Sequence, residues 1–173
     1  MADININHEI CRIRQPSANS CWAACLVMFC EAARMPCYTI QGVTRRAQQH
    51  GVILEANGSL NTSPENMARL QSAFRMRILP NRGVVHISHL LPYLNRAPLI
   101  IFGAFNYSGN LSPMNHAVIM GGIWGDGSPT TAVSIIDPQR TQNGYDAVDD
   151  DVLDWRTFCT QTCARLDYVG ALG

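Results

Sequence analysis

One cysteine of the sequence stands where a thiol can react. Cys21 follows the polar, turn-prone residues 16–20 and opens an apolar run that contains no Gly or Pro. Asn19 or Ser20 would cap a helix at this point, so Cys21 is expected in the first helical turn. There the unpaired N–H groups and the helix dipole favour negative charge, and a thiol loses its proton more easily. The pattern therefore predicts a nucleophilic thiolate at Cys21.

A possible partner of this thiol is Gln15, six positions before it in the loop that leads into the helix. Its side-chain amide can donate a hydrogen bond close to the sulfur, as an oxyanion-hole donor does. Gln15 and the run Ser20-Cys21-Trp22 resemble the active-site segment of papain-like cysteine peptidases. In that family a Gln six residues before a Ser-Cys-Trp at a helix N-terminus supplies the oxyanion donor and the nucleophile. The resemblance implies these two roles for Gln15 and Cys21.

The candidate base is His116, in the run Asn115-His116-Ala117-Val118. This run opens a predicted strand at the edge of the polar loop 106–115. A base that must contact a thiolate benefits from a backbone that is held rigidly by a strand and a side chain that faces the open loop region. Papain-like peptidases have a similar Asn/Asp-His-Ala-Val sequence at their catalytic histidine, and this resemblance implies the same role for His116.

The candidate third member of the site is Asp137, which ends the next strand in Ile135-Ile136-Asp137-Pro138. A turn near residues 126–127 makes the two strands an antiparallel hairpin, so His116 and Asp137 are expected at the same end. A carboxylate there can accept the imidazole N–H and fix its tautomer and orientation.

Asp137 and its following proline bear on the choice among papain-like relatives. Papain itself has an Asn at this third position. An Asp followed by Pro is more similar to the bacterial relatives, the effector proteases and the leader-peptide-processing peptidases of export systems. The latter usually have Asp-Cys-Gly, where this chain has Ser20-Cys21-Trp22. The resemblance therefore favours the effector proteases.

The remaining cysteines allow two interpretations. The chain has seven cysteines, an odd number that suits one free catalytic thiol and up to three disulfides in an oxidising destination. Cys25 and Cys30 can equally be small core residues of the helix. The candidate disulfides are Cys159–Cys163 and a pairing among Cys11, Cys25, Cys30 and Cys37.

The other histidines have no setting comparable to that of His116, and they are expected on the surface or in loops. They are His8, His50, His86 and His89. Cys159 and Cys163, together with Cys37 or a histidine, could form a zinc site, but their spacing is weak evidence for one. We therefore expect neither a metal nor a cofactor.

The apolar periodicity and the turn residues predict an α+β fold of helices followed by an antiparallel sheet. The central, apolar helix that carries Cys21 should be buried between the two parts. We expect one domain over residues 1–173, with a helical half of about 1–95 and a sheet half of about 96–173; the resemblance implies the papain-like fold for it. Helices are expected at 21–35, 39–50, 64–74, 87–94 and 149–158, and strands at 75–79, 99–105, 116–123, 131–136 and 165–169, with a strand or extended arm within 1–14.

The composition excludes several classes of function. Hydrophobic residues make up 47% of the 173 residues and charged residues 15%, which is typical of a globular domain. The formal net charge is +0 and there is no basic stripe, so nucleic acid is not an expected partner. No apolar run approaches the roughly 20 residues that span a bilayer, so no membrane association is expected. Residues 1–5 lack the charged and apolar regions of a signal peptide.

All 13 basic residues are arginine. A protein without lysine offers a ubiquitin-using cell no acceptor side chain, although an arginine-biased genome would produce the same absence. Together with the resemblance to effector proteases, this favours a secreted or injected bacterial effector or toxin that reaches its target cell without a cleaved signal peptide. Its expected partners are a protein or peptide substrate and an inhibitor or immunity protein.

The function predicted from these residues is hydrolysis of peptide bonds by a thiol hydrolase with a Cys21-His116-Asp137 triad and Gln15 as oxyanion donor. Two alternatives stay open. One is an amidase acting on cell-wall peptide or isopeptide bonds. The other is a disulfide- or zinc-stapled binding module without turnover.

Overall fold

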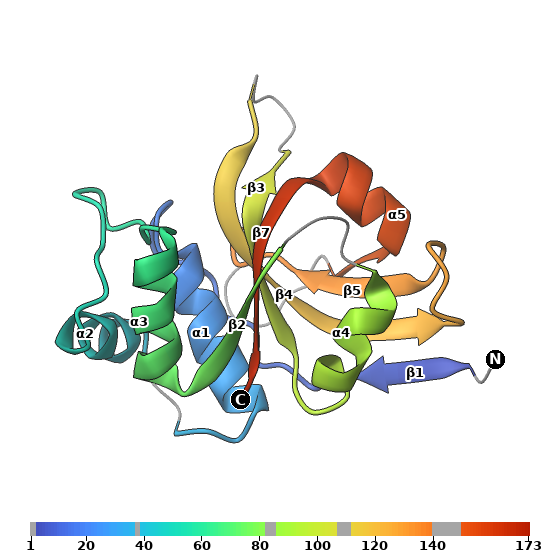
Figure 1. The fold of residues 1–173 in the computed structure, drawn as a ribbon, viewed down its shortest axis with the longest axis horizontal. Coiled ribbons are helices and arrows are strands. Elements are labelled where there is room, and N and C mark those ends of the chain that lie inside the picture. Colours follow the sequence, from blue (N-terminus) through green and yellow to red (C-terminus); the bar gives the residue numbers. More distant parts are fainter. Residues whose placement is uncertain (1–2, 37–38, 82–85, 107–111, 140–149) are drawn as a thin grey trace.

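The fold combines a helical N-terminal part with a C-terminal antiparallel sheet, which confirms the predicted α+β class. The computed structural model describes residues 3–36, 39–81, 86–106, 112–139 and 150–173. Three helices lie together on one side of the sheet (Figure 1): α1 (Cys21–Ala32), α2 (Ile40–Gln49) and α3 (Pro64–Phe74). A fourth helix, α4 (Ile87–Leu94), lies on the other side.

Every strand pairing in the sheet is antiparallel, and the order along it is β2-β7-β3-β4-β5-β6. β1 pairs with the far end of β4, beyond the part that pairs with β3. β4 is therefore in contact with three other strands. The strands are β1 (Ile4–Asn7), β2 (Met76–Pro80), β3 (Leu99–Phe105), β4 (Met114–Gly125), β5 (Ala132–Ile136), β6 (Asp150–Asp154) and β7 (Cys163–Leu172).

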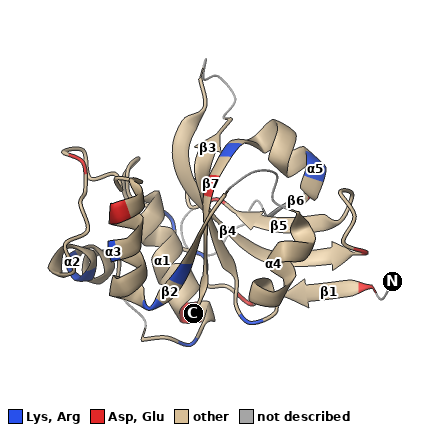
Figure 2. Cartoon of the chain, in the orientation of Figure 1, with Lys and Arg blue, Asp and Glu red and all other residues tan. Residues whose placement is uncertain are grey.

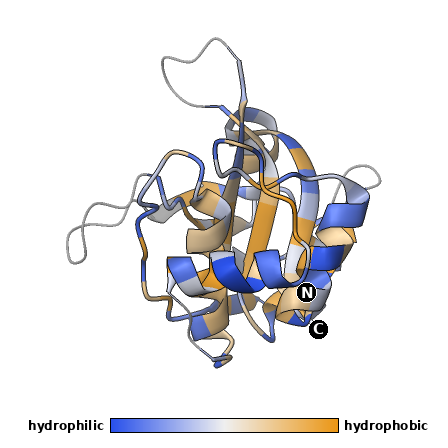
Figure 3. Cartoon of the chain, turned by 90° about the vertical axis from the view of Figure 1, so that its left-hand side faces the viewer, coloured by the Kyte–Doolittle hydropathy of each residue, from blue (hydrophilic) through white to orange (hydrophobic). Residues whose placement is uncertain are grey.

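Two hydrophobic clusters cover the two faces of this sheet. Alternate side chains of a strand point to opposite faces, and β3 follows this rule. Ile100 and Phe102 pack with the residues of α1, α2 and α3, whereas Leu99 and Ile101 pack with those of α4. Figure 3, seen from the helical side, shows apolar strands behind helices with hydrophilic outer surfaces. A fully buried strand such as β3 is expected to be apolar at every position, and it is.

Helix α1 is the buried centre of the helical part, as predicted. All ten of its residues from Cys21 to Cys30 are buried, which fits a helix that is apolar around its whole circumference. It ends three residues earlier than the predicted Met35. Arg34 adopts a left-handed conformation with φ 54°, and the backbone N–H of Met35 donates to Cys30 O over 2.8 Å. This arrangement terminates a helix without glycine.

The other predicted helices of the N-terminal part are confirmed. Thr39 caps α2 by accepting a hydrogen bond from the backbone N–H of Gly42, and Pro64 occupies the first turn of α3. α4 forms over the predicted residues 87–94 even though Pro92 lies inside it. The predicted strands at 75–79, 99–105, 116–123, 131–136 and 165–169 correspond to β2, β3, β4, β5 and β7, with bounds that differ most in β4 and β7.

The helix predicted over residues 149–158 is wrong for residues 150–154 and confirmed for residues 155–157. Residues 150–154 form the edge strand β6, which pairs with β5, while residue 149 lies outside the described residues. The acidic run suggested the first turn of a helix, but strand pairing prevails there. Only Asp154 acts as a cap, accepting a hydrogen bond from Thr157 N over 2.8 Å. The helical segment begins at that point, with α5 (Trp155–Thr157) and the π-helix η1 (Phe158–Thr162).

Positive and negative side chains are spread over the helices and strands of both parts rather than gathered on one element (Figure 2). This distribution agrees with the formal net charge of +0. Among the residues that the structure describes, no helix combines the length and the apolar character needed to cross a membrane.

Candidate active site

Three distant parts of the chain bring Cys21, His116 and Asp137 together. Cys21 is the first residue of α1, His116 is the third residue of β4, and Asp137 follows the last residue of β5. His116 Nε2 donates to Asp137 Oδ1 over 2.8 Å, and the imidazole also makes a hydrogen bond with Cys21. Because Nε2 faces Asp137, the ring nitrogen available to the thiol is Nδ1. The β4–β5 pairing produces this arrangement, since Ile119 lies opposite Ile136.

Cys21 lies at the N-terminus of α1, and Ser20 occupies the N-cap position, as predicted. The Ser20 hydroxyl does not accept a hydrogen bond from the helix. It turns back into the preceding loop, where it accepts from Ser17 N over 3.1 Å and donates to Ser17 O over 2.9 Å. The first-turn N–H groups keep their positive electrostatic potential, which favours a thiolate or an oxyanion beside Cys21.

The carboxylate of Asp137 is oriented by its own backbone turn. Asp137 Oδ1 accepts a hydrogen bond from Gln139 N over 2.9 Å as well as from His116. Pro138 fixes the chain between these two residues. Such a side-chain-to-backbone turn holds the carboxylate before a ligand arrives. The side chain of Asp137 is only 12% exposed, so its interaction with His116 is shielded from water.

The environment of His116 favours a positively charged imidazole. Its side chain is buried, and its ring contacts the edge of the Phe105 ring at a centroid distance of 5.8 Å. Burial lowers the pKa of His116, but the hydrogen bonds to Asp137 and Cys21 and the charges of these two residues outweigh it and raise the pKa to about 9. An imidazolium between a carboxylate and a thiol is the state expected at neutral pH.

Gln15 is buried in the loop before α1 and is attached to the Asp137 turn through the backbone. Its N–H donates to Pro138 O over 3.0 Å. Its side-chain Nε2 donates to Ser17 O over 2.9 Å, and no described residue offers a hydrogen bond to the buried Oε1. An amide NH2 carries two hydrogens, so a second one is left for a ligand. Gln15 is not among the residues that line the cleft at Cys21.

A cleft opens beside the Cys21 thiol between α1 and the sheet. One wall comes from the loop before α3, which is held against the start of α1 by two hydrogen bonds. Trp22 Nε1 donates to Gly58 O over 3.3 Å, and Asn19 Nδ2 donates to Asn57 O over 3.0 Å. The residues lining the cleft are Cys21 and Trp22 of α1, Ser59, Leu60 and Thr62 of the loop, Phe102 and Gly103 of β3, Asn115, His116 and Ala117 of β4, and Asp167 of β7.

The sequence indicated only part of this cleft. Residues 55–63 are recognisable as a turn-rich loop, but nothing in their spacing shows that they face Cys21. Asp167 gave no signal at all, because it lies in the middle of a strand and far from the triad in sequence. The position of Asp167 in the cleft follows only from the pairing of β7 with β3, and that of the loop follows only from its contacts with α1.

Three other described thiols, those of Cys25, Cys159 and Cys163, are poor nucleophiles. Burial raises the pKa of Cys25 well above its usual value, and the charges of Cys21 and Asp137 raise it further. Burial also raises the pKa of Cys159 to about 11 and that of Cys163 to about 12. Cys159 and Cys163 are free thiols, so the predicted disulfide between them is wrong, and Cys25 is a free core thiol. Cys37 lies outside the described residues.

The described residues do not contain a group of three or more His, Cys, Asp or Glu side chains able to hold a metal ion. Cys159 and Cys163 thus lack a third zinc ligand within this part of the chain. His50, His86 and His89 are exposed, as expected, and His8 is half-buried, with Nε2 at 2.6 Å from Leu94 O. None of these four histidines lines the cleft.

Comparison with known proteins identifies the fold. No protein-family model and no curated protein matches the sequence. A candidate C39-like peptidase from Bacillus anthracis matches in structure with a TM-score of 0.54 and 11% identity, over 98% of each chain. UfSP from C. elegans matches with a TM-score of 0.54 and 15% identity over 98% of this chain, which spans 34% of that protein. Both have the papain-like fold, so this part of the prediction is confirmed.

The raised pKa of His116 predicts a pH-dependent stability. Folding raises the pKa of His116 from 6.5 to about 9, so the folded protein binds this proton more tightly than the unfolded chain does. Below pH 6.5 the resulting stabilisation of the folded state is fully present. That stability is lost as the pH rises through about 9, and it amounts to on the order of 3 kcal/mol. Urea unfolding from pH 6 to pH 10 should therefore show a fall in the free energy of unfolding that is absent from His116→Ala.

The exposed His50 provides the matched control, because His50→Ala should keep the fall seen in the parent protein. An identical pH dependence of the parent and of His116→Ala would contradict the proposed environment of His116.

Proposed function

We propose that this chain is a papain-like cysteine peptidase in which the Cys21 thiolate attacks the carbonyl carbon of a peptide bond. The observation that carries the proposal is the hydrogen-bonded series Cys21–His116–Asp137 at the N-terminus of a buried helix. A thiol, an imidazole and a carboxylate in this order are the parts of a nucleophile, its base and the group that orients the base.

In the first half of the reaction the thiolate sulfur of Cys21 bonds to the carbonyl carbon, and the carbonyl oxygen becomes an oxyanion. The C–N bond then breaks, and the departing nitrogen takes the proton of His116 Nδ1. The first product is an amine, and the enzyme is left as a thioester on Cys21. Asp137 keeps the imidazole in the orientation that this transfer needs, through the 2.8 Å bond to Nε2.

In the second half a water molecule gives a proton to His116 Nδ1 and attacks the thioester carbon. The C–S bond breaks, the acid is released, and the thiolate–imidazolium pair is restored. The backbone N–H of Cys21 and the second amide hydrogen of Gln15 stabilise the oxyanion of both halves. One such donor contributes about 3 kcal/mol to transition-state stabilisation.

The hydrolysis is tested by four alanine variants assayed on a proteome-derived peptide library by mass spectrometry. Cys21→Ala should abolish cleavage, and His116→Ala should lose about as much, because the pair acts as a unit. Asp137→Ala should lose less, since Asp137 orients the base without reacting. Gln15→Ala should lower kcat by about a hundredfold with little change in KM, as expected of a donor that acts in the transition state.

Two matched controls accompany these variants. His50→Ala removes an exposed histidine and Cys159→Ala removes a thiol outside the cleft, and both should keep full activity. Loss of cleavage in either control, or cleavage that survives Cys21→Ala, would refute the assignment. A folded protein that cleaves only isopeptide or cell-wall amides would replace the peptidase by an amidase with the same triad.

We propose that this peptidase works inside a target cell, where it acts as an effector or toxin on a host protein. The support comes from the 13 arginines without a single lysine. Such a surface gives ubiquitin ligases no side-chain amine. An inhibitor or immunity protein in the producing cell would be the natural partner of a toxic peptidase.

Introducing lysines should shorten the lifetime of the protein in eukaryotic cytosol. Arg45 and Arg69 are exposed, so Arg45→Lys and Arg69→Lys should each lower the half-life in a pulse-chase experiment, and a proteasome inhibitor should restore it. Arg82 and Arg140 lie outside the described residues and are not used for this test. An unchanged half-life would reduce the absence of lysine to codon bias.

A further inference from the structure

One carboxylate faces the cleft from a strand that carries no member of the triad. Asp167 of β7 lines the cleft together with Cys21 and His116, and no other Asp or Glu does so among the described lining residues. Much of the remaining lining is apolar, with Trp22, Leu60 and Phe102. A charged group at the edge of an apolar slot has a strong influence on what enters, because the surroundings screen it less than water does.

A β-bulge aims Asp167 into the cleft. On β3, Phe102 lies opposite Tyr168 and Gly103 lies opposite Leu166, so Asp167 is an extra residue of β7 with no partner on β3. Bulges redirect a side chain away from the regular alternation of a strand, and they are frequent next to active sites. Asp167 therefore points where a regular strand would not have placed it.

Gly103 is the residue that makes room for this bulge. A Cβ on Gly103 would clash with Arg165 O, and only a shift of the β7 backbone could relieve this clash. Gly103 also lines the cleft and lies opposite His116 on β4. Strand β7 thus comes closest to β3 beside His116, and Asp167 on β7 lies in the same cleft as this histidine.

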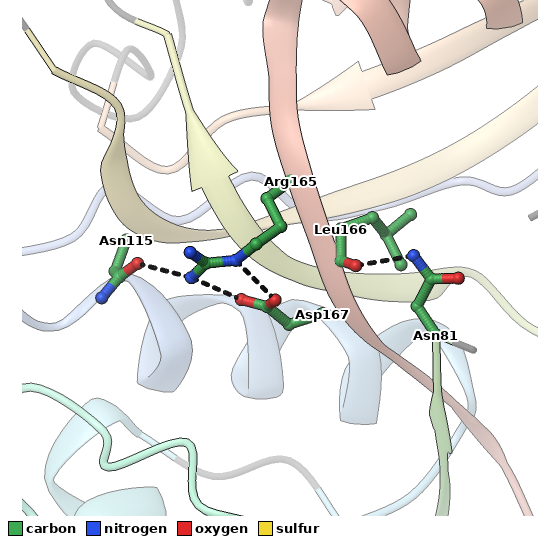
Figure 4. A network of polar contacts seen from close by, with 5 residues as sticks. All are labelled: Asn81, Asn115, Arg165, Leu166 and Asp167. Carbon is green, nitrogen blue, oxygen red and sulfur yellow. Dashed lines mark hydrogen bonds and ion pairs between the residues drawn. The ribbon is translucent and has the colours of Figure 1, made fainter. Parts of the chain in front are cut away.

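The bulge is fixed from outside by polar contacts (Figure 4). Asn81 holds its backbone, since its N–H donates to Asp167 O over 2.9 Å and its Nδ2 donates to Leu166 O over 2.8 Å. Arg165 binds both oxygens of Asp167, Nε to Oδ1 over 2.7 Å and Nη2 to Oδ2 over 3.1 Å. Nη2 also reaches Asn115 Oδ1 at 3.5 Å. The carboxylate is thus positioned before any substrate binds.

From this geometry we infer that Asp167 selects substrates with a basic side chain close to the scissile bond, an inference that rests on the proposed peptidase function. The methylene stem of a substrate Arg or Lys packs on the apolar lining of the cleft, and its charged end meets the carboxylate. Each carboxylate oxygen keeps acceptor capacity after binding one N–H of Arg165. A substrate guanidinium or ammonium can therefore join the pair without displacing it.

The partner Arg165 does not reverse this preference. Its side chain is 63% exposed, whereas that of Asp167 is 25% exposed, and Arg165 is not among the cleft-lining residues. Water screens the guanidinium more effectively than it screens the carboxylate. An acidic substrate side chain in the slot would meet Asp167 first and be repelled.

The test measures how fast dipeptidyl vinyl sulfones alkylate Cys21, followed by intact-mass spectrometry. Arg, Leu or Glu is placed in turn at each of the two positions before the electrophile. At one of these positions the Arg probe should react faster than the Leu probe by about tenfold, and the Glu probe should react most slowly. Asp167→Asn should remove the advantage of the Arg probe over the Leu probe, while Asp167→Glu should retain the order.

Two matched variants separate selection by Asp167 from an effect of Arg165 and from a general effect of negative charge on the surface. Arg165→Ala should leave the Arg advantage intact or increase it, and Glu31→Gln, which neutralises an exposed carboxylate on α1, should change nothing. Equal rates for Arg, Leu and Glu, or a fastest Glu probe whose advantage disappears in Arg165→Ala, would overturn the inference. So would an equal loss on all probes in Asp167→Asn, because Asp167 would then position the site.

Failure of the peptidase proposal itself has a different signature. In that case no probe would alkylate Cys21 in the parent protein, and the inference about Asp167 would fall with it.

Discussion

The site depends on one buried hydrogen bond, from His116 Nε2 to Asp137 Oδ1 over 2.8 Å. An imidazole removed from water would ordinarily lose its proton, and the burial of His116 works in that direction. The Asp137 carboxylate on one side and the Cys21 sulfur on the other outweigh this effect and raise the pKa of His116 above its usual value. The positive charge of His116 then faces the Cys21 sulfur. Without the Asp137 contact, burial would favour the neutral form of His116.

The rest of the fold holds these three groups at hydrogen-bond distance. The β4–β5 pairing fixes His116 and Asp137 at one end of a hairpin. Helix α1, which is apolar from Cys21 to Cys30, is buried against β4 and β3 and presents Cys21 at its N-terminus. The bond from Gln15 N to Pro138 O ties the loop before α1 to the turn after β5. The helical part and the sheet are therefore joined at the site by a backbone hydrogen bond and by the side chains of Cys21, His116 and Asp137. The geometry of the site thus depends on the packing of the whole core.

Local signals in the sequence were enough to single out the segments that carry Cys21, His116 and Asp137. A polar run before an apolar run marks the start of α1, and strand alternation with a turn marks the hairpin that carries His116 and Asp137. β6 was predicted as a helix, because three aspartates suggest a helix start unless the pairing with β5 is known. Asp167 could not be found, since a bulge depends on the register between two strands distant in sequence and leaves no local pattern.

The most direct test of the positive charge on His116 is an NMR titration of the histidine ring nitrogens, which needs no substrate. Long-range 1H–15N spectra follow all five histidines, and His116→Ala identifies the signal of His116. We predict that His116 remains an imidazolium through neutral pH and titrates near pH 9, and that Asp137→Ala lowers this pKa. A His116 that titrates at or below its usual pKa of 6.5 in the parent protein would contradict the positively charged imidazole on which the account depends.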